Sequence, residues 1–121
     1  MKRILVVDDE AGIRLLLQEF LKREGYETML AANGQEALSF AQQESFACAL
    51  LDMRMPNMSG LELLEELKVL QPELPVMMMT AYGERQLIEQ AQQLGVTHYF
   101  TKPFSILEVR DVLRKILQGE H

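Results

Sequence analysis

Five short apolar runs alternate with five amphipathic segments, and this alternation constrains the fold more than any other feature of the chain. The runs cover residues 4–7, 27–31, 47–51, 76–79 and 96–100. The first and fourth runs are apolar at every position, which is typical of strands buried on both faces, as in a parallel sheet. The sequence therefore predicts five strands, each followed by a helix.

The segments between the runs have the spacing of amphipathic helices. In the first segment, apolar residues fall on one helical face, and Gly25 follows where a helix should end. Ser59 and Glu62 have the spacing of a capping box at the start of the third helix. Strands and helices that alternate in this way predict right-handed βαβ units on one sheet. We expect one doubly wound α/β domain over residues 1–121, with no linker or repeat.

Composition and net charge argue against several classes of protein. The chain has no apolar run of about 18 residues and no signal-peptide pattern, so we expect no membrane association and a cytoplasmic location. One cysteine allows no disulfide within the chain. The net charge of −6 argues against direct nucleic-acid binding, which needs a basic surface.

Polar residues gather at the ends of four of the five predicted strands. Asp8 and Asp9 follow the first strand, Asp52 the third, Thr80 the fourth and Lys102 the fifth. Ligands of open α/β sheets bind beyond the carboxyl ends of the strands, so we expect these side chains to share one crevice.

The residue types in this crevice suggest phosphoryl chemistry. Three crowded carboxylates repel one another unless a cation neutralises them, and Mg²⁺ suits a site with few protein ligands. A carboxylate can attack phosphorus to give an acyl phosphate, while a lysine and a metal stabilise the transferring oxygens. A threonine hydroxyl can bind a phosphoryl oxygen.

These residues, in this order, resemble the receiver domains of two-component response regulators across essentially the whole chain. The resemblance rests on Asp8-Asp9, Asp52, Thr80-Ala81 and Lys102-Pro103, with Pro56 and Gly60 matching the loop after Asp52. It implies the flavodoxin-like (βα)5 receiver fold, with strand order 2-1-3-4-5. It also implies a phosphoryl-accepting signalling protein rather than an enzyme.

The same resemblance implies a role for each site residue. Asp52 would be the phosphoacceptor, with Thr80 and Lys102 binding the phosphoryl oxygens. Mg²⁺ would be held by Asp9, Asp52 and the backbone carbonyl of Arg54, and by Asp8 through a water molecule. Tyr99 lies at the aromatic switch position, and Lys102-Pro103 matches the family's cis peptide bond.

Within the family, the chain resembles the single-domain sporulation phosphorelay regulators of bacilli, for example at residues 31–34 and 79–84. It departs from them at Tyr99, where they have His, and at Glu10-Ala11, where they have Gln-Tyr. The resemblance implies a monomer whose partners are a sensor histidine kinase and a histidine phosphotransferase. We expect the docking face to include Gly12, Ile13, Leu16, Pro103 and Phe104.

Other functions on this architecture fit less well. A flavodoxin needs a phosphate loop rich in Ser, Thr and Gly after the first strand, where this chain has Asp8-Asp9-Glu10. A haloacid-dehalogenase-type phosphatase needs Asp-x-Asp there, but Glu10 stands two residues after Asp8. The chain has neither a Walker loop nor G-x-G-x-x-G, so the phosphoryl donor must come from outside. The remaining alternative is the receiver of a DNA-binding transcription regulator whose output domain is absent from this chain.

Overall fold

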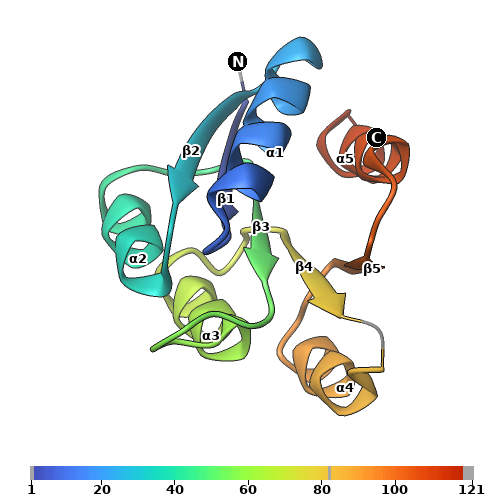
Figure 1. Ribbon diagram of the computed structural model, residues 1–121. Coiled ribbons are helices and arrows are strands. Elements are labelled where there is room, and N and C mark those ends of the chain that lie inside the picture. The colour runs from blue at the N-terminus through green and yellow to red at the C-terminus, as the bar shows by residue number, and fades with distance from the viewer. Residues whose placement is uncertain (1, 82, 119–121) are drawn as a thin grey trace.

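A five-stranded parallel sheet forms the centre of the computed structural model, which describes residues 2–81 and 83–118 (Figure 1). The strand order is β2-β1-β3-β4-β5, as the sequence predicts. The strands are β1 (Arg3–Val7), β2 (Glu27–Ala31), β3 (Cys48–Asp52), β4 (Val76–Ala81) and β5 (His98–Lys102). In a sheet of this order, the polarity of the connections reverses between β1 and β3, so the strand ends beside that point can form a ligand site.

One helix follows each strand, and the helices form two layers. They are α1 (Ala11–Arg23), α2 (Gly34–Gln43), α3 (Gly60–Leu70), α4 (Arg85–Gln93) and α5 (Ile106–Gln118). Helices α1 and α5 cover one face of the sheet, and α2, α3 and α4 cover the other (Figure 1). Within the described residues, no helix is long and apolar enough to cross a membrane.

The apolar residues of the central strands serve both layers, because successive side chains point to opposite faces of a sheet. In β1, Leu5 and Val7 belong to the core beneath α2, α3 and α4, whereas Ile4 and Val6 belong to the core beneath α1 and α5. All four are fully buried. This double burial explains why the first run has no polar position.

Local sequence features determine where two of the helices begin or end. The Ser59 hydroxyl accepts a hydrogen bond from the Glu62 N–H, and the Glu62 carboxylate accepts one from the Ser59 N–H, which confirms the capping box. Gly25 has φ +91° just beyond α1, a left-handed conformation that favours glycine.

The last three strands end later in the chain than hydropathy predicts. Strand β3 ends at Asp52, β4 extends to Ala81, and β5 runs two residues later than the apolar run that predicts it. Strands β4 and β5 remain paired beyond their apolar residues, because Thr80 pairs with Thr101 and Ala81 pairs with Lys102. The site residues of these strands are therefore held by the sheet rather than by the loops after it.

Candidate functional site

Three carboxylates converge at the carboxyl ends of β1 and β3. Asp8 and Asp9 follow β1 directly, and Asp52 is the last residue of β3. One oxygen from each of the three carboxylates lies within 4.8 Å of the others. Asp8 and Asp52 are buried, whereas Asp9 is exposed. Neighbouring parallel strands thus bring together residues more than 40 positions apart, as the sequence predicts.

Asp8 is fixed by hydrogen bonds to the start of α1. The Glu10 N–H donates to Asp8 Oδ1 at 2.9 Å, and Arg14 Nη1 donates to the Asp8 backbone carbonyl at 2.7 Å. Together they hold the turn between β1 and α1, so one carboxylate of the cluster is oriented in advance.

Lys102 reaches the cluster from the end of β5. Its ammonium Nζ lies 3.3 Å from Asp8 Oδ2 and 3.4 Å from Asp52 Oδ1, with Glu10 at 4.0 Å. The Lys102–Pro103 peptide bond is cis, as the resemblance implies. Within the described residues, Lys102 thus faces Asp8, Asp52 and Glu10, with Asp9 in the same cluster, so carboxylates outnumber cations there.

The pKa values of two groups reflect this imbalance. The pKa of Asp52 is raised from 3.8 to about 6, first by burial and then by the negative charge of Asp8, while Lys102 and the Arg54 N–H act in the opposite direction. Burial lowers the pKa of Lys102, but Asp52 and Asp8 more than offset this effect, so the net shift is upward. Ionised Asp52 thus lies in a site that favours an added cation.

Thr80, near the end of β4, carries a buried hydroxyl. Its residue is 1% exposed, and Oγ1 has no hydrogen-bond partner among the residues that the structure describes. A buried hydroxyl without a partner is costly, and an oxygen-rich ligand would satisfy it. This observation fits the predicted contact between Thr80 and a phosphoryl group.

The loop after β3 approaches Asp52 closely. The Arg54 N–H lies 3.4 Å from Asp52 Oδ1. A Cβ atom at Gly60 would lie 2.5 Å from the Asp52 backbone oxygen and 2.8 Å from Met53 Cα. Only glycine allows α3 to begin this close to the end of β3, which explains the glycine at this position.

The side chain of Arg54 forms an ion pair that the sequence analysis missed. It extends across the mouth of the site to Glu84, in the loop after β4, and pairs with its carboxylate. Glu84 also accepts a hydrogen bond from the Ala81 N–H at 2.9 Å. The sequence signal was slight, because Glu84 is one acid among many and its partner Arg54 lies 30 residues earlier.

Several of these groups line a cavity of about 250 Å³. Its walls are Asp9, Glu10, Asp52, Arg54, Ala81, Glu84 and Lys102. The clustered carboxylate oxygens are the hard ligands that Mg²⁺ prefers, so the donor set fits this ion. The structure brings together Asp8, Asp9, Asp52 and Lys102. Thr80 lies near the end of the neighbouring strand β4, and its side chain is not part of the cavity wall.

Comparison with known proteins assigns the family. The model of the response regulator receiver domain family matches residues 4–114, which is most of the chain. This protein belongs to that family. The strand order and helix layers of the receiver match the fold that the resemblance implies.

Two curated relatives show the range of proteins that carry such a receiver. Sporulation initiation phosphotransferase F of Bacillus subtilis is 46% identical over 116 residues, covering 96% of this chain and 94% of the relative. Transcriptional regulatory protein SrrA of Staphylococcus aureus is 40% identical, covering 93% of this chain but only 48% of the relative. Among solved structures, a CheY-like receiver domain protein of Methanospirillum hungatei has a TM-score of 0.94 at 33% identity, covering 98% of this chain and 94% of that chain.

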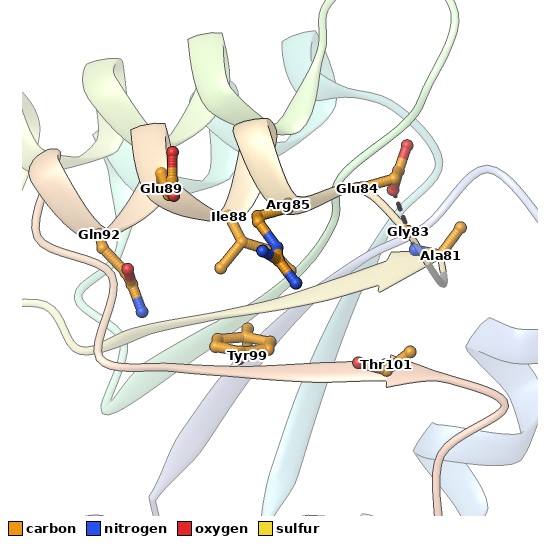
Figure 2. Close-up of a pocket in the computed structure, with 9 residues that line it drawn as sticks. All are labelled: Ala81, Gly83, Glu84, Arg85, Ile88, Glu89, Gln92, Tyr99 and Thr101. Carbon is orange, nitrogen blue, oxygen red and sulfur yellow. Dashed lines mark hydrogen bonds between the residues drawn. The ribbon is translucent and has the colours of Figure 1, made fainter.

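The predicted switch residue, Tyr99, lies outside the acid cluster. It is 39% exposed on β5 and lines a second cavity, of about 450 Å³, between β5 and α4. Figure 2 shows its ring beneath Ile88 and Arg85, with Thr101 on the same strand. Tyr99 therefore faces α4 rather than Asp52 in this state of the receiver.

The predicted docking residues divide into exposed and packed side chains. Leu16 is 50% exposed, and Gly12 and Pro103 are also exposed. Ile13 and Phe104 are partly buried and pack against the core beneath α1 and α5. Of the two apolar residues predicted for the docking face on α1, Leu16 is the exposed one and Ile13 is partly buried. Leu15 on α1 and Leu107 on α5 are also exposed and were not predicted.

Proposed function

We propose that this receiver accepts a phosphoryl group on Asp52 from a phosphohistidine of a sensor histidine kinase and passes it to a histidine phosphotransferase. The observation that carries the proposal is the contact of Asp52 with Lys102 beside two further carboxylates at one edge of the sheet. The Thr80 hydroxyl near the end of β4, buried and without a partner among the described residues, adds to it. The protein would act as a phosphoryl carrier and not as an enzyme with a separate substrate, although it assists its own phosphorylation and dephosphorylation.

The transfer exchanges one phosphorus bond for another. An Asp52 oxygen attacks phosphorus as the bond to the histidine nitrogen breaks, and that nitrogen keeps the electron pair. Lys102, already 3.4 Å from Asp52, would neutralise charge on the transferring oxygens. The Thr80 hydroxyl would donate to one of those oxygens. The onward transfer to the next histidine is the reverse exchange.

The metal site would be formed by Asp9, Asp52 and the Arg54 backbone carbonyl, with Asp8 acting through water. The closeness of the three carboxylates supports this assignment, and so does the raised pKa of Asp52. Bound Mg²⁺ supplies Lewis-acid stabilisation of phosphoryl oxygens. The exposed position of Asp9 leaves it accessible to an ion from solvent.

The partner assignment rests on the relative in Bacillus subtilis, whose name describes a sporulation initiation phosphotransferase. We infer that this receiver acts in a similar relay. The histidine-bearing partner would dock next to the site, on the exposed Gly12, Leu16 and Pro103 and on the partly exposed Ile13 and Phe104. Phosphorylation would draw Thr80 toward the phosphoryl group and turn Tyr99 inward. Unchanged NMR signals of both residues upon addition of beryllofluoride, a phosphoryl mimic, would contradict this switch.

The alternative role is that of a receiver from a DNA-binding transcription regulator. It is favoured by the relative SrrA, of which this chain spans about half. The phosphoryl chemistry is the same in both roles, and only the output differs. Phosphate transfer from the labelled receiver to a purified histidine phosphotransferase separates them, since only the relay requires it.

The deciding experiment is labelling of Asp52→Asn with acetyl phosphate and with a phosphorylated kinase. We expect no labelling from either donor, because an amide oxygen is a poor nucleophile toward phosphorus. Circular dichroism should show an intact fold, since a strand-end carboxylate is not part of the apolar core. Substantial label on the folded variant would rule out Asp52 as the acceptor.

A further inference from the structure

Glu84 places a further anion beside the proposed phosphorylation site. Its side chain is only 9% exposed, and it lines both the cavity at Asp52 and the cavity at Tyr99. A carboxylate so far removed from water needs compensation from its neighbours. Two groups provide it, the Ala81 N–H and the Arg54 guanidinium.

Both of these neighbours face the cavity in which a phosphoryl group on Asp52 would lie. Ala81 follows Thr80 directly, and its N–H donates to Glu84 in Figure 2. Arg54 is 72% exposed at the mouth of the cavity, so its position depends on the pairing with Glu84. Glu84 therefore binds two groups, the Ala81 N–H donor and the Arg54 cation, that a phosphoryl group on Asp52 could bind instead.

We propose that Glu84 is a latch that the phosphoryl group displaces, an inference that rests on the proposed phosphorylation of Asp52. Before phosphorylation, the carboxylate holds the Ala81 N–H and Arg54. Afterwards, the phosphoryl oxygens compete for both groups, since they carry about −1.5 to −2 charge at neutral pH and are strong acceptors. Glu84 is a positioning residue, because it acts through Ala81 and Arg54 and not on phosphorus.

The latch also connects the two cavities. Glu84 directly precedes the first residue of α4, and its side chain makes no capping bond to that helix. Its release would leave α4 intact but would remove the tether from the N-terminal end of α4 to β4. The wall of the cavity at Tyr99 would then change, because Glu84 and Arg85 both line it.

The test is the affinity for beryllofluoride at saturating Mg²⁺, measured by calorimetry on the full chain. Glu84→Gln keeps a neutral acceptor but removes the charge that holds Arg54 and strengthens the bond from Ala81. We expect binding about three- to tenfold tighter, since the competing state loses a charge-assisted hydrogen bond. Arg54→Gln should weaken binding, because it leaves the Glu84 charge unneutralised beside the site.

Glu89→Gln is the matched control. Glu89 lies on α4 and lines the cavity at Tyr99, so the variant makes the same change in net charge without touching Ala81 or Arg54. Equal affinities of Glu84→Gln and Glu89→Gln would overturn the latch, because the effect would then be one of general charge. A parent chain that does not bind beryllofluoride would contradict the proposed function itself, and the latch with it.

A second measurement follows the displacement directly by NMR. On addition of beryllofluoride to the parent chain, the Glu84 carboxylate carbon and the Ala81 amide should shift together as their hydrogen bond breaks. In Glu84→Gln the Ala81 amide should shift less, because its starting bond is weaker. A Glu84 signal that stays constant while the Ala81 amide shifts would overturn the proposal, even if the variants change affinity.

Discussion

The carboxylate of Asp52 lies in an environment that opposes its own ionisation. Burial and the nearby charge of Asp8 raise its pKa to about 6, although Lys102 partly offsets both effects. A nucleophile must be ionised, so the site is incomplete without further positive charge. The residue types alone suggested a cation, and the local electrostatics give the physical reason.

This environment predicts how stability depends on pH in the absence of metal. Because the pKa of Asp52 is raised on folding, the native state holds the proton between pH 3.8 and about 6, while the unfolded state has lost it. Asp52 therefore lowers the stability of the native state as pH rises through this window, and the cost persists at neutral pH. We expect Asp52→Asn to be more stable than the parent at pH 7 without metal.

The advantage of Asp52→Asn should shrink as pH falls below about 6 and should disappear below pH 3.8, where the parent carboxyl is protonated in both states. Urea denaturation of both proteins from pH 3 to pH 8 measures this difference. An advantage that is independent of pH would show that the asparagine acts by packing and not by removing charge.

At the scale of the element, α1 shows how one helix serves both the core and a partner. Leu17 and Leu21 are fully buried against the sheet, whereas Leu15 and Leu16 are at least half exposed at the end of the helix near Asp8. Ile13 lies between these two environments. Exposed leucines beside a reaction site are a reasonable docking element, because their burial by a partner is favourable.

Single alanine substitutions on α1 should separate stability from docking. Leu16→Ala should change stability by at most about 0.5 kcal/mol and leave labelling by acetyl phosphate intact, while slowing phosphate exchange with the histidine-bearing partner. Leu17→Ala should destabilise the fold by about 2–5 kcal/mol, since it opens a cavity in the core. Ile13→Ala should fall between the two in stability.

Chemical denaturation and radiolabel transfer to a purified phosphotransferase give the two readouts. If Leu16→Ala and Ile13→Ala both exchange phosphate at the parent rate, the partner docks on another surface. Leu15→Ala then tests whether the neighbouring leucine carries the contact.

At the scale of the molecule, metal binding should be linked to global stability. An ion that binds only the folded state stabilises it, by about 2.7 kcal/mol when its concentration is 100 times the dissociation constant. We expect Mg²⁺ to raise the Tm of the parent by several degrees and to raise that of Asp9→Asn less, since Asp9 is a proposed direct ligand. Asp8→Asn should have a smaller effect than Asp9→Asn on metal affinity.

Thermal unfolding with increasing Mg²⁺ measures this linkage, and Ca²⁺ provides a comparison for ion preference. Addition of a chelator should return the parent to its metal-free Tm and stop labelling by acetyl phosphate. Labelling that continues unchanged in the presence of the chelator would contradict a metal-dependent transfer.

The sequence by itself determined the fold class and predicted which polar side chains follow or end the strands at the carboxyl edge of the sheet. Runs such as residues 4–7 are apolar at every position because both faces of the central strands are covered. Asp8, Asp9, Asp52, Thr80 and Lys102 were predictable because parallel strands must bring their carboxyl ends to one edge. These features depend on local patterns and on topology, which a sequence carries directly.

Only the tertiary structure decided how side chains from distant segments meet. It showed that Leu16 and not Ile13 is the exposed member of the pair on α1, and that the Thr80 hydroxyl has no partner among the described residues. It also revealed the ion pair between Arg54 and Glu84, which no local sequence pattern predicts. Such contacts form only when the fold places two loops 30 residues apart next to each other. The burial, charge and geometry of the side chains in these loops are therefore properties of the folded chain alone.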